Sequence, residues 1–517
     1  MTLAEAPTLV DRRTRVWAHR QIAYVATAAL LVLPCVWLPD IQASDLGSHL
    51  YNAWLSNRAA AGELPGLYLV PQYTNVLFDI LLSWLLKSFG AVAAERIGVI
   101  AAVEIFFWGC FALVSAVRGR AAWARAPMLV LLTFGAVFRM GFFNFYISVG
   151  ICCLAIALIW SGVRRWLAIP LLLVAATAHF LPCLWAALAI AYVLTARRLS
   201  PAQRWWLLTG GLIAIGGLAA LIAARLPSVW VHGVRIESFF GADQVLTFGA
   251  KYNILAAALL CWFVIFLVRR LESDDRPWAD PVFHLWILLG AATILLPDTI
   301  WMPWYTGGLA YIGLRLSLLS AILLCAAVAR VASKPVETAG LTLLLVIFLS
   351  FSYVDERQLN HVEQEMSDAI ATLPPSARVI SAVKDSRLYI PALEHVAARL
   401  CIGRCFDFAD YEPTTAQFRL RARPGNSFTL TELSDIDNLE HHQLAFRGAP
   451  VAVYRLSYCP NQPKICVDRL SAGQQVVKED IPQNQSLRLM GSRRGPTKTS
   501  ASVPQLMTNK IGQPAGR

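Results

Sequence analysis

Apolar runs of about 17–25 residues recur along the chain between Gln21 and Tyr353. One run of that length crosses the hydrocarbon core of a bilayer, which is about 30 Å thick. Charged residues make up 15% of the chain and hydrophobic residues 57%, whereas a soluble globular protein carries about 25% charged residues. The apolar surplus therefore belongs to membrane helices, and we predict an α-helical integral membrane bundle with about 10–13 transmembrane helices.

The distribution of positive charge predicts how the bundle is oriented. The net charge of +12 would suit a nucleic-acid-binding protein, but much of it lies in short loops and in the C-terminal tail, so we predict no nucleic-acid partner. Basic loops face the cytoplasm. We therefore place the arm 1–20 and the loops at 197–198, 269–270 and 330–334 in the cytoplasm, and everything after Tyr353 outside it. A cleaved signal peptide is the alternative for the first apolar run, but no small-x-small cleavage site precedes Asp40.

Composition divides the chain into four parts. The cytoplasmic arm, residues 1–20, precedes a polytopic membrane domain over 21–353, whose first exported loop is 40–73. Mixed charge and short β-type runs then predict a small extracytoplasmic α+β domain over 354–490. Residues 491–517 form a basic, polar tail that cannot bury enough apolar area to fold. Two stretches stay open: 74–89 is either a span or a helix that dips into the bilayer, and 167–194 is one helix or two helices divided at 179–182.

The cysteines separate into two groups. Seven of the eleven lie in predicted spans, where a thiol behaves as a small apolar group. The other four, Cys401, Cys405, Cys459 and Cys466, lie in the predicted exported domain. An even number in an oxidising compartment predicts two disulfides of undetermined connectivity. A four-cysteine zinc site is the alternative.

The first exported loop carries the most informative polar pattern. Ser44 or Asp45 can cap a helix that Gly62 can end. At 100° per residue, one polar face collects Asp45, Ser48, His49, Asn52 and Ser56, and apolar residues fill the adjoining face. This pattern predicts an amphipathic helix at the bilayer surface. Asp45 and His49 are one turn apart, so their side chains can meet. The alternative is that Asp45 is only a helix cap and His49 a surface residue.

This arrangement resembles the GT-C superfamily of membrane glycosyltransferases, in particular bacterial members with an Asp-x-x-x-His-Leu pattern, here Asp45 to Leu50. The resemblance covers roughly the first 350 residues and maps the acidic residue of that loop onto Asp45. It implies a polyprenyl-phosphate-linked sugar donor, transfer at the outer face of an inner membrane, and a glycan, lipid or protein acceptor. Many members carry a second acid beside the first, where this chain has Ser44 and Leu46. A divalent cation, if one is used, would therefore be held by Asp45.

The residue types suit that chemistry. Glycosyl transfer needs a base for the acceptor proton, and Asp45 is predicted to supply it, with His49 as its hydrogen-bonding partner or as a second proton acceptor. The lipid phosphate leaving group needs cations. We predict that Arg139, Lys251 and Arg315 bind phosphate, with snorkelling towards headgroups as the alternative. The polar face contributes Asn52 to substrate binding, and His179 either lines the cavity or is a packing residue. The buried acids Asp79 and Glu104 are predicted to pair with an arginine or a polar neighbour and to be structural.

The exported domain has one dense cluster of charges. Asp407, Asp410 and Glu412 could bind a cation, and Arg419 and Arg421 an anion, although local pairing within a disulfide-stapled loop is the alternative. Walker-type, nucleophile-elbow and histidine-rich zinc motifs are absent from the sequence, which argues against ATP hydrolysis, serine hydrolysis and zinc protease chemistry. Two further function classes stay open: a lipid-glycan flippase or transporter, and a non-catalytic scaffold with an exported binding domain.

Overall fold

The computed structural model describes residues 9–470 except 232–235, 274–276, 303–307, 416, 431–451, 461 and 463, with side chains from residue 21 onwards. The predicted tail at 491–517 and the end of the predicted exported domain lie outside the described residues. The first helices are α1 (Leu9–Val32), α2 (Leu46–Ala60), α3 (Leu77–Phe89), α4 (Ala91–Arg118), α5 (Ala126–Thr133), α6 (Ala136–Arg139), α7 (Phe143–Ser161), α8 (Ala168–Ala178) and α9 (Phe180–Ala196). The later ones are α10 (Pro201–Arg225), α11 (Ile236–Phe240), α12 (Tyr252–Leu271), α13 (Pro281–Leu295), α14 (Ile312–Ala327), α15 (Pro335–Ala371) and α16 (Val396–Leu400).

Several helices are built to cross a membrane. Among the described residues, α4, α7, α10, α12 and α15 are long and apolar enough to do so, and five further apolar helices have 10–17 residues. The chain is therefore a multi-pass membrane protein, whereas the count of about 10–13 spans stays a prediction. Helix α3 has 13 residues, about 20 Å at 1.5 Å per residue, which is too short to span and fits the dipping helix.

Of the two alternatives for 167–194, the structure has two helices. Helix α8 ends at Ala178 and α9 begins at Phe180, and His179 between them has an extended backbone. The His179 side chain accepts a hydrogen bond from the backbone N–H of Leu181 at 3.2 Å, so it caps the start of α9.

The boundary expected at Tyr353 falls inside a helix. Helix α15 runs for 37 residues from Pro335 to Ala371 without interruption. The buried side chains Glu356, Leu359, Glu363, Met366 and Ile370 keep a helical spacing beyond the apolar run. Nearly half of α15, from residue 354 to its end, therefore belongs to the region that was expected to be a separate domain.

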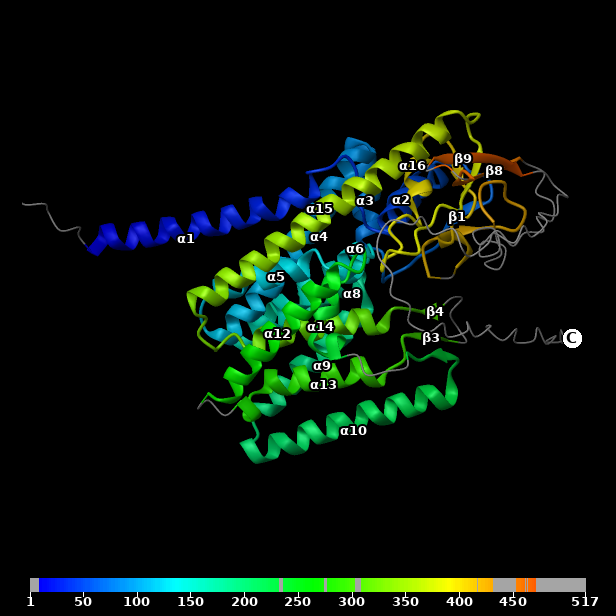
Figure 1. The fold of residues 1–517 in the computed structure, drawn as a ribbon. Helices are drawn as coiled ribbons and strands as arrows, with labels where there is room; N and C mark the ends of the chain where they lie inside the picture. The colour runs from blue at the N-terminus through cyan, green and yellow to red at the C-terminus, as the bar shows by residue number, and fades with distance from the viewer. Residues whose placement is uncertain are drawn as a thin grey trace, which may run out of the picture. The chain divides into compact units, whose positions relative to one another are not determined.

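That region contains the predicted α+β structure, but it also takes a strand from the first loop. Four strands form a mixed sheet in the order β6-β5-β8-β9: β5 (Arg378–Ser381), β6 (Phe406–Asp407), β8 (Val453–Tyr458) and β9 (Ile465–Leu470). A second pairing joins β1 (Leu67–Leu69) antiparallel to β7 (Leu420–Ala422). Figure 1 shows α2, α16, β8 and β9 gathered at one end of the long helices. The loop 40–73 and the C-terminal region therefore lie on the same side of the membrane. A small sheet of β2 (Ser228–Val229), β3 (Thr299–Trp301) and β4 (Gly308–Leu309) joins two other loops.

Buried ion pairs attach the C-terminal region to the helices. Arg399 on α16 donates to Glu363 on α15 at 2.6 Å and to Glu95 on α4 at 3.3 Å. Guanidinium groups suit such sites because two of their N–H donors can bind the two oxygens of one carboxylate. The ends of α4 and α15 and the short helix α16 thus share one charge network.

The cysteine prediction is confirmed, and its connectivity is set. Cys401 is bonded to Cys405, and Cys459 to Cys466. The four-cysteine zinc alternative is wrong, because each sulfur is already in a disulfide. Two disulfides in this region fit an oxidising compartment.

Candidate functional site

Helix α2 carries most of the predicted site, and protein surrounds it. Both its polar residues and its apolar residues are buried along Leu46–Ser56, apart from Trp54. The helix itself was predicted correctly. Its predicted location at the bilayer surface was wrong, because the side chains of α2 are buried within the protein. Hydrogen bonds join the polar face of α2 to the C-terminal region and to α3. These two parts of the chain therefore cover the face that was expected to meet solvent.

The turn between α6 and α7 fixes the position of Asp45. The backbone N–H of Ser44 donates to the Arg139 carbonyl at 2.8 Å, and that of Asp45 donates to the Met140 carbonyl at 3.1 Å. Gly141 has φ +78°, and a Cβ there would lie 2.6 Å from the Asp45 nitrogen. The turn can approach this closely only because residue 141 has no side chain.

The Asp45 carboxylate faces the C-terminal region. Its Oδ1 lies 3.6 Å from Nε2 of His395, and the Asp45 side chain is 21% exposed. Gly47 permits this approach, since a Cβ at that position would lie 2.2 Å from the His395 carbonyl oxygen. Burial raises the pKa of Asp45 above its usual value, and His395 and His49 oppose that shift. Asp45 is thus a mostly enclosed carboxylate with raised proton affinity and a remaining opening to solvent.

His49 does not pair with the Asp45 side chain, contrary to the prediction. Its Nδ1 lies 2.8 Å from Oδ1 of Asp79 on α3. Asn144 donates to the other Asp79 oxygen at 3.2 Å, so the expected polar neighbours of Asp79 are confirmed, as is one for Glu104, which accepts from Trp108 at 2.7 Å. Burial opposes the charged form of His49, but Asp79 outweighs it and raises the pKa of His49 to about 9. The His49–Asp79 pair is therefore a buried ion pair that fixes α2 against α3.

We expect this pair to make stability fall as the pH rises. The pKa of His49 is about 9 in the folded chain against about 6.5 for an ordinary histidine, so its stabilisation is complete below pH 6.5 and is lost progressively up to pH 9. The loss is at most about 3 kcal/mol. Thermal unfolding between pH 7 and 9.5 measures it. His49→Gln should flatten that dependence, and His361→Gln, at an exposed position on α15, should not.

Two carboxylic acids of the C-terminal region cover the rest of the polar face. Ser48 Oγ donates to Glu412 at 2.8 Å, and Asn52 Nδ2 donates to Asp410 at 3.0 Å. Burial raises the pKa of Glu412 well above its usual value and the pKa of Asp410 to about 7. These acids pair with a helix more than 350 residues earlier. The local pairing that was the alternative is also present, since Asp410 accepts from the backbone N–H of Glu412 at 3.3 Å. Asn52 is held by this contact and has a structural role.

Arg315 is the predicted cation that still interacts electrostatically with Asp45. It stands at the start of α14, with its guanidinium carbon 4.2 Å from the centre of the Phe142 ring. Its Nη1 donates to the Ala310 carbonyl at 2.5 Å, and it forms no ion pair with a carboxylate among the described residues. Asp45 is the strongest of the negative charges that act on it. Asp45 and Arg315 therefore influence each other electrostatically, and the Arg315 guanidinium has no carboxylate in an ion pair with it among the described residues.

The other predicted substrate-binding residues already have partners. Arg139 and Glu356 form an ion pair at 2.5 Å, and each side chain is 1% exposed. Lys251 pairs with Asp355 at 2.7 Å. Arg139 has no accessible charge to offer a phosphate, so we correct its role to a structural one. His179 is the helix cap described above and lies within electrostatic range of Arg315.

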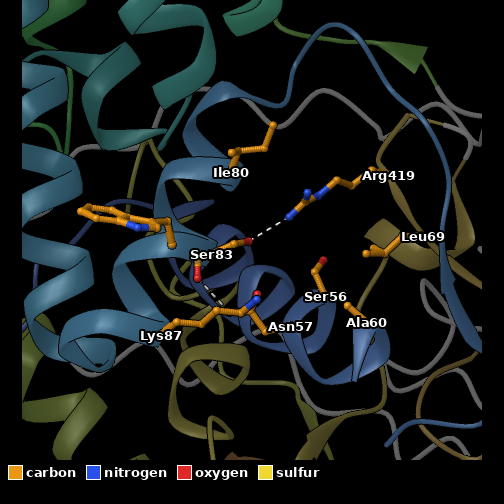
Figure 2. A pocket seen from close by; sticks show the side chains of 9 residues that line it. Ser56, Asn57, Ala60, Leu69, Ile80, Ser83, Lys87 and Arg419 are labelled. Atoms are coloured by element: carbon orange, nitrogen blue, oxygen red, sulfur yellow. Dashed lines mark hydrogen bonds between the residues drawn. The ribbon is translucent and has the colours of Figure 1, made fainter. Parts of the chain in front are cut away.

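A pocket of about 280 Å³ lies along the second half of α2, and its lining does not include Asp45 or Arg315. Figure 2 shows Arg419 reaching across it to Ser83. No cluster of three or more His, Cys, Asp or Glu side chains in the described part of the chain could hold a metal ion.

Sequence reasoning missed two aromatic neighbours of Asp45 that the C-terminal region supplies. His395 faces the carboxylate, and the Tyr411 ring lies 5.2 Å from the His395 ring. Their distance along the chain from Asp45 leaves no periodic signal in the sequence. The case for a site therefore rests on the geometry of these residues, because no protein-family model, no curated protein and no solved structure matches this chain.

Proposed function

We propose that the protein is a membrane glycosyltransferase that moves a sugar from a polyprenyl-phosphate donor to an acceptor on the extracytoplasmic side of an inner membrane. The observation that carries the proposal is the position of Asp45. It is a mostly buried carboxylate just after the first membrane helix, with 21% of its side chain exposed and with Arg315 within electrostatic range. Burial favours proton uptake by a carboxylate, which is what a base in this reaction requires.

Each group has a defined task in the proposed reaction. Asp45 takes the proton of an acceptor hydroxyl, whose oxygen forms a bond to the anomeric carbon of the sugar. The bond between that carbon and the phosphate oxygen breaks, and polyprenyl phosphate leaves with the electron pair. Arg315 stabilises the negative charge that develops on the phosphate. His395, 3.6 Å from Asp45, orients the carboxylate.

The same observations favour this function over a non-catalytic scaffold. A scaffold would leave the Asp45 carboxylate in bulk solvent without a cation nearby. Here a carboxylate is withdrawn from water at an energetic cost, and such groups concentrate at functional sites.

The test is Asp45→Asn in the full chain, reconstituted into vesicles. The probes are undecaprenyl-phosphate-linked mannose, glucose and galactose with a radiolabelled sugar, and the readout is release of undecaprenyl phosphate with transfer of label. We expect transfer to fall by about 100-fold or more, because general-base catalysis contributes about 10²–10⁴-fold. Thermal stability should be retained, since asparagine keeps the shape of the side chain.

Glu63→Gln is the matched control. Glu63 is an exposed acid of the same loop, paired with Arg58 at 2.7 Å, and its variant should transfer at the parent rate. Full activity of the Asp45→Asn variant would remove Asp45 as the base. A parent protein that turns over none of the three donors would overturn the transferase proposal.

A further inference from the structure

The pocket beside the second half of α2 combines cations, hydroxyls and an apolar wall (Figure 2). Its volume is about 280 Å³, just below the usual range of about 300–1,000 Å³ for small-molecule sites. A headgroup would fit in it, whereas a whole lipid would not. The residues that line it come from α2, β1, α3 and the segment before β7: Ser56, Asn57, Ala60, Leu69, Ile80, Ser83, Trp84, Lys87 and Arg419.

The two cations of the pocket have unused charge. Arg419 Nη2 donates to Ser83 Oγ at 2.8 Å, and its buried Nε has no hydrogen-bond partner. Neither Arg419 nor Lys87 forms an ion pair with a carboxylate in the described ranges. An arginine with a buried, unsatisfied N–H group loses hydrogen-bond energy until an acceptor arrives. Two positive charges without acids predict an anionic ligand.

The hydroxyl groups add donors that suit the same ligand. Ser83 Oγ accepts from Arg419 and keeps its own O–H free to donate. The Ser83 carbonyl is already occupied, because Asn57 Nδ2 donates to it at 2.9 Å. Ser56 is buried on the facing wall and its hydroxyl points towards Arg419 in Figure 2. The polar side of the pocket therefore presents mainly donors, and phosphate oxygens are strong acceptors.

The apolar side faces outwards along α3. Ile80 is 48% and Trp84 60% exposed. Helix α3 is too short to span the bilayer, and exposed tryptophans concentrate at membrane interfaces. An acyl or isoprenoid chain attached to a headgroup in the pocket would therefore lie against these two side chains.

We propose that this pocket binds the phosphate monoester headgroup of a membrane lipid. A phosphate monoester carries about −1.5 to −2 charges near neutral pH, which matches Arg419 and Lys87 together. Polyprenyl phosphates and phosphatidic acid both have this headgroup. The inference does not depend on the proposed transferase activity, because Asp45 and Arg315 lie outside the pocket.

The experiment measures binding to the purified full chain in non-ionic detergent, by titration calorimetry and by the ligand-induced rise in melting temperature. The probes are farnesyl phosphate, dioctanoyl phosphatidic acid, dioctanoyl phosphatidylglycerol, farnesol and inorganic phosphate. We expect one or both phosphate-monoester lipids to bind. Phosphatidylglycerol, a diester with one charge, should bind about tenfold more weakly, and farnesol and inorganic phosphate more weakly still.

Three variants locate the site. Arg419→Gln and Lys87→Gln should each weaken binding by about tenfold or more. Ser56→Leu should abolish it by filling the pocket while both cations remain. Lys87 is exposed, so its variant tests the charge even if Arg419→Gln fails to fold. Arg58→Gln is the control, because Arg58 lies on the same helix outside the lining and pairs with Glu63.

The outcomes separate the ligand sources. Tighter binding of farnesyl phosphate assigns the site to isoprenoid phosphates, and tighter binding of phosphatidic acid assigns it to glycerophospholipids. Equal affinity for inorganic phosphate, or unchanged binding in Lys87→Gln and Ser56→Leu, overturns the proposal. Asp45→Asn should bind as the parent does, so loss of transfer and loss of lipid binding can be told apart.

Discussion

Replacing Glu356 with alanine is expected to destabilise the protein by about 3–5 kcal/mol, because it leaves the Arg139 guanidinium as an unpaired buried charge. The two side chains lie 2.5 Å apart and each is 1% exposed, so water cannot take the place of the carboxylate. Trp37 also loses its acceptor, since its Nε1 donates to Glu356 at 3.3 Å. Thermal unfolding of the purified protein measures the effect.

The same change should also impair the candidate site. Arg139 Nη1 donates to the Gln42 carbonyl at 3.2 Å, and the Arg139 carbonyl accepts from Ser44. A displaced Arg139 therefore moves the segment that ends in Asp45. We expect transfer activity to fall together with stability, whereas Asp45→Asn should lose activity alone.

Two further variants decide whether the buried charge is the cause. Glu365→Ala removes another acid of α15, which pairs with the exposed His361 at 3.5 Å, and it should cost about 0–1 kcal/mol. The double variant Arg139→Met with Glu356→Met should recover most of the lost stability, because apolar residues of similar volume replace buried ion pairs at little cost. A Glu356→Ala variant as mild as Glu365→Ala would contradict this explanation.

The helices could be read from the sequence because their signals are local. An apolar run long enough to cross a bilayer is visible without knowledge of its partners. The break at His179 was one of two alternatives for 167–194, and Pro182, which follows within a turn and favours a helix start, is the local signal for it. The four cysteines of the C-terminal region likewise indicated two disulfides, although only coordinates could pair Cys401 with Cys405.

The partners of the site residues could not be read in the same way. The spacing of Asp45 and His49 predicted contact along one helix, but His49 turns to Asp79 and Asp45 to His395. Helical periodicity says which side chains share a face and nothing about which distant segment covers it. The end of the apolar run at Tyr353 suggested a domain boundary, yet the buried Glu356 and Glu363 continue the same face of α15. Charged residues that are buried in ion pairs lower the mean hydropathy of a helix, so the hydropathy of the sequence does not show that this face of the helix is packed.

Close approach of α4 and α7 gives the second large effect. An alanine Cβ at Gly109 would lie 1.9 Å from the Gly150 carbonyl oxygen, and one at Gly150 would lie 2.5 Å from the Ile105 carbonyl oxygen. These neighbours are backbone atoms, which cannot rotate away as a side chain would. The two helices meet where both lack side chains, as small-residue interfaces between membrane helices do.

We therefore expect Gly109→Ala to force α4 and α7 apart and to cost about 3 kcal/mol or more, at the upper end of overpacking effects. The matched control is Gly216→Ala on the apolar helix α10, where nothing lies within 4 Å of the added Cβ. That variant should be neutral or stabilised by up to about 1 kcal/mol, because alanine favours helices over glycine. Folded yield in mild detergent and thermal unfolding measure both. Similar behaviour of the two variants would mean that α4 and α7 do not approach so closely. The packing of α7 that places Asn144 against Asp79, and thereby Asp79 against His49 on α2, would then have to be different.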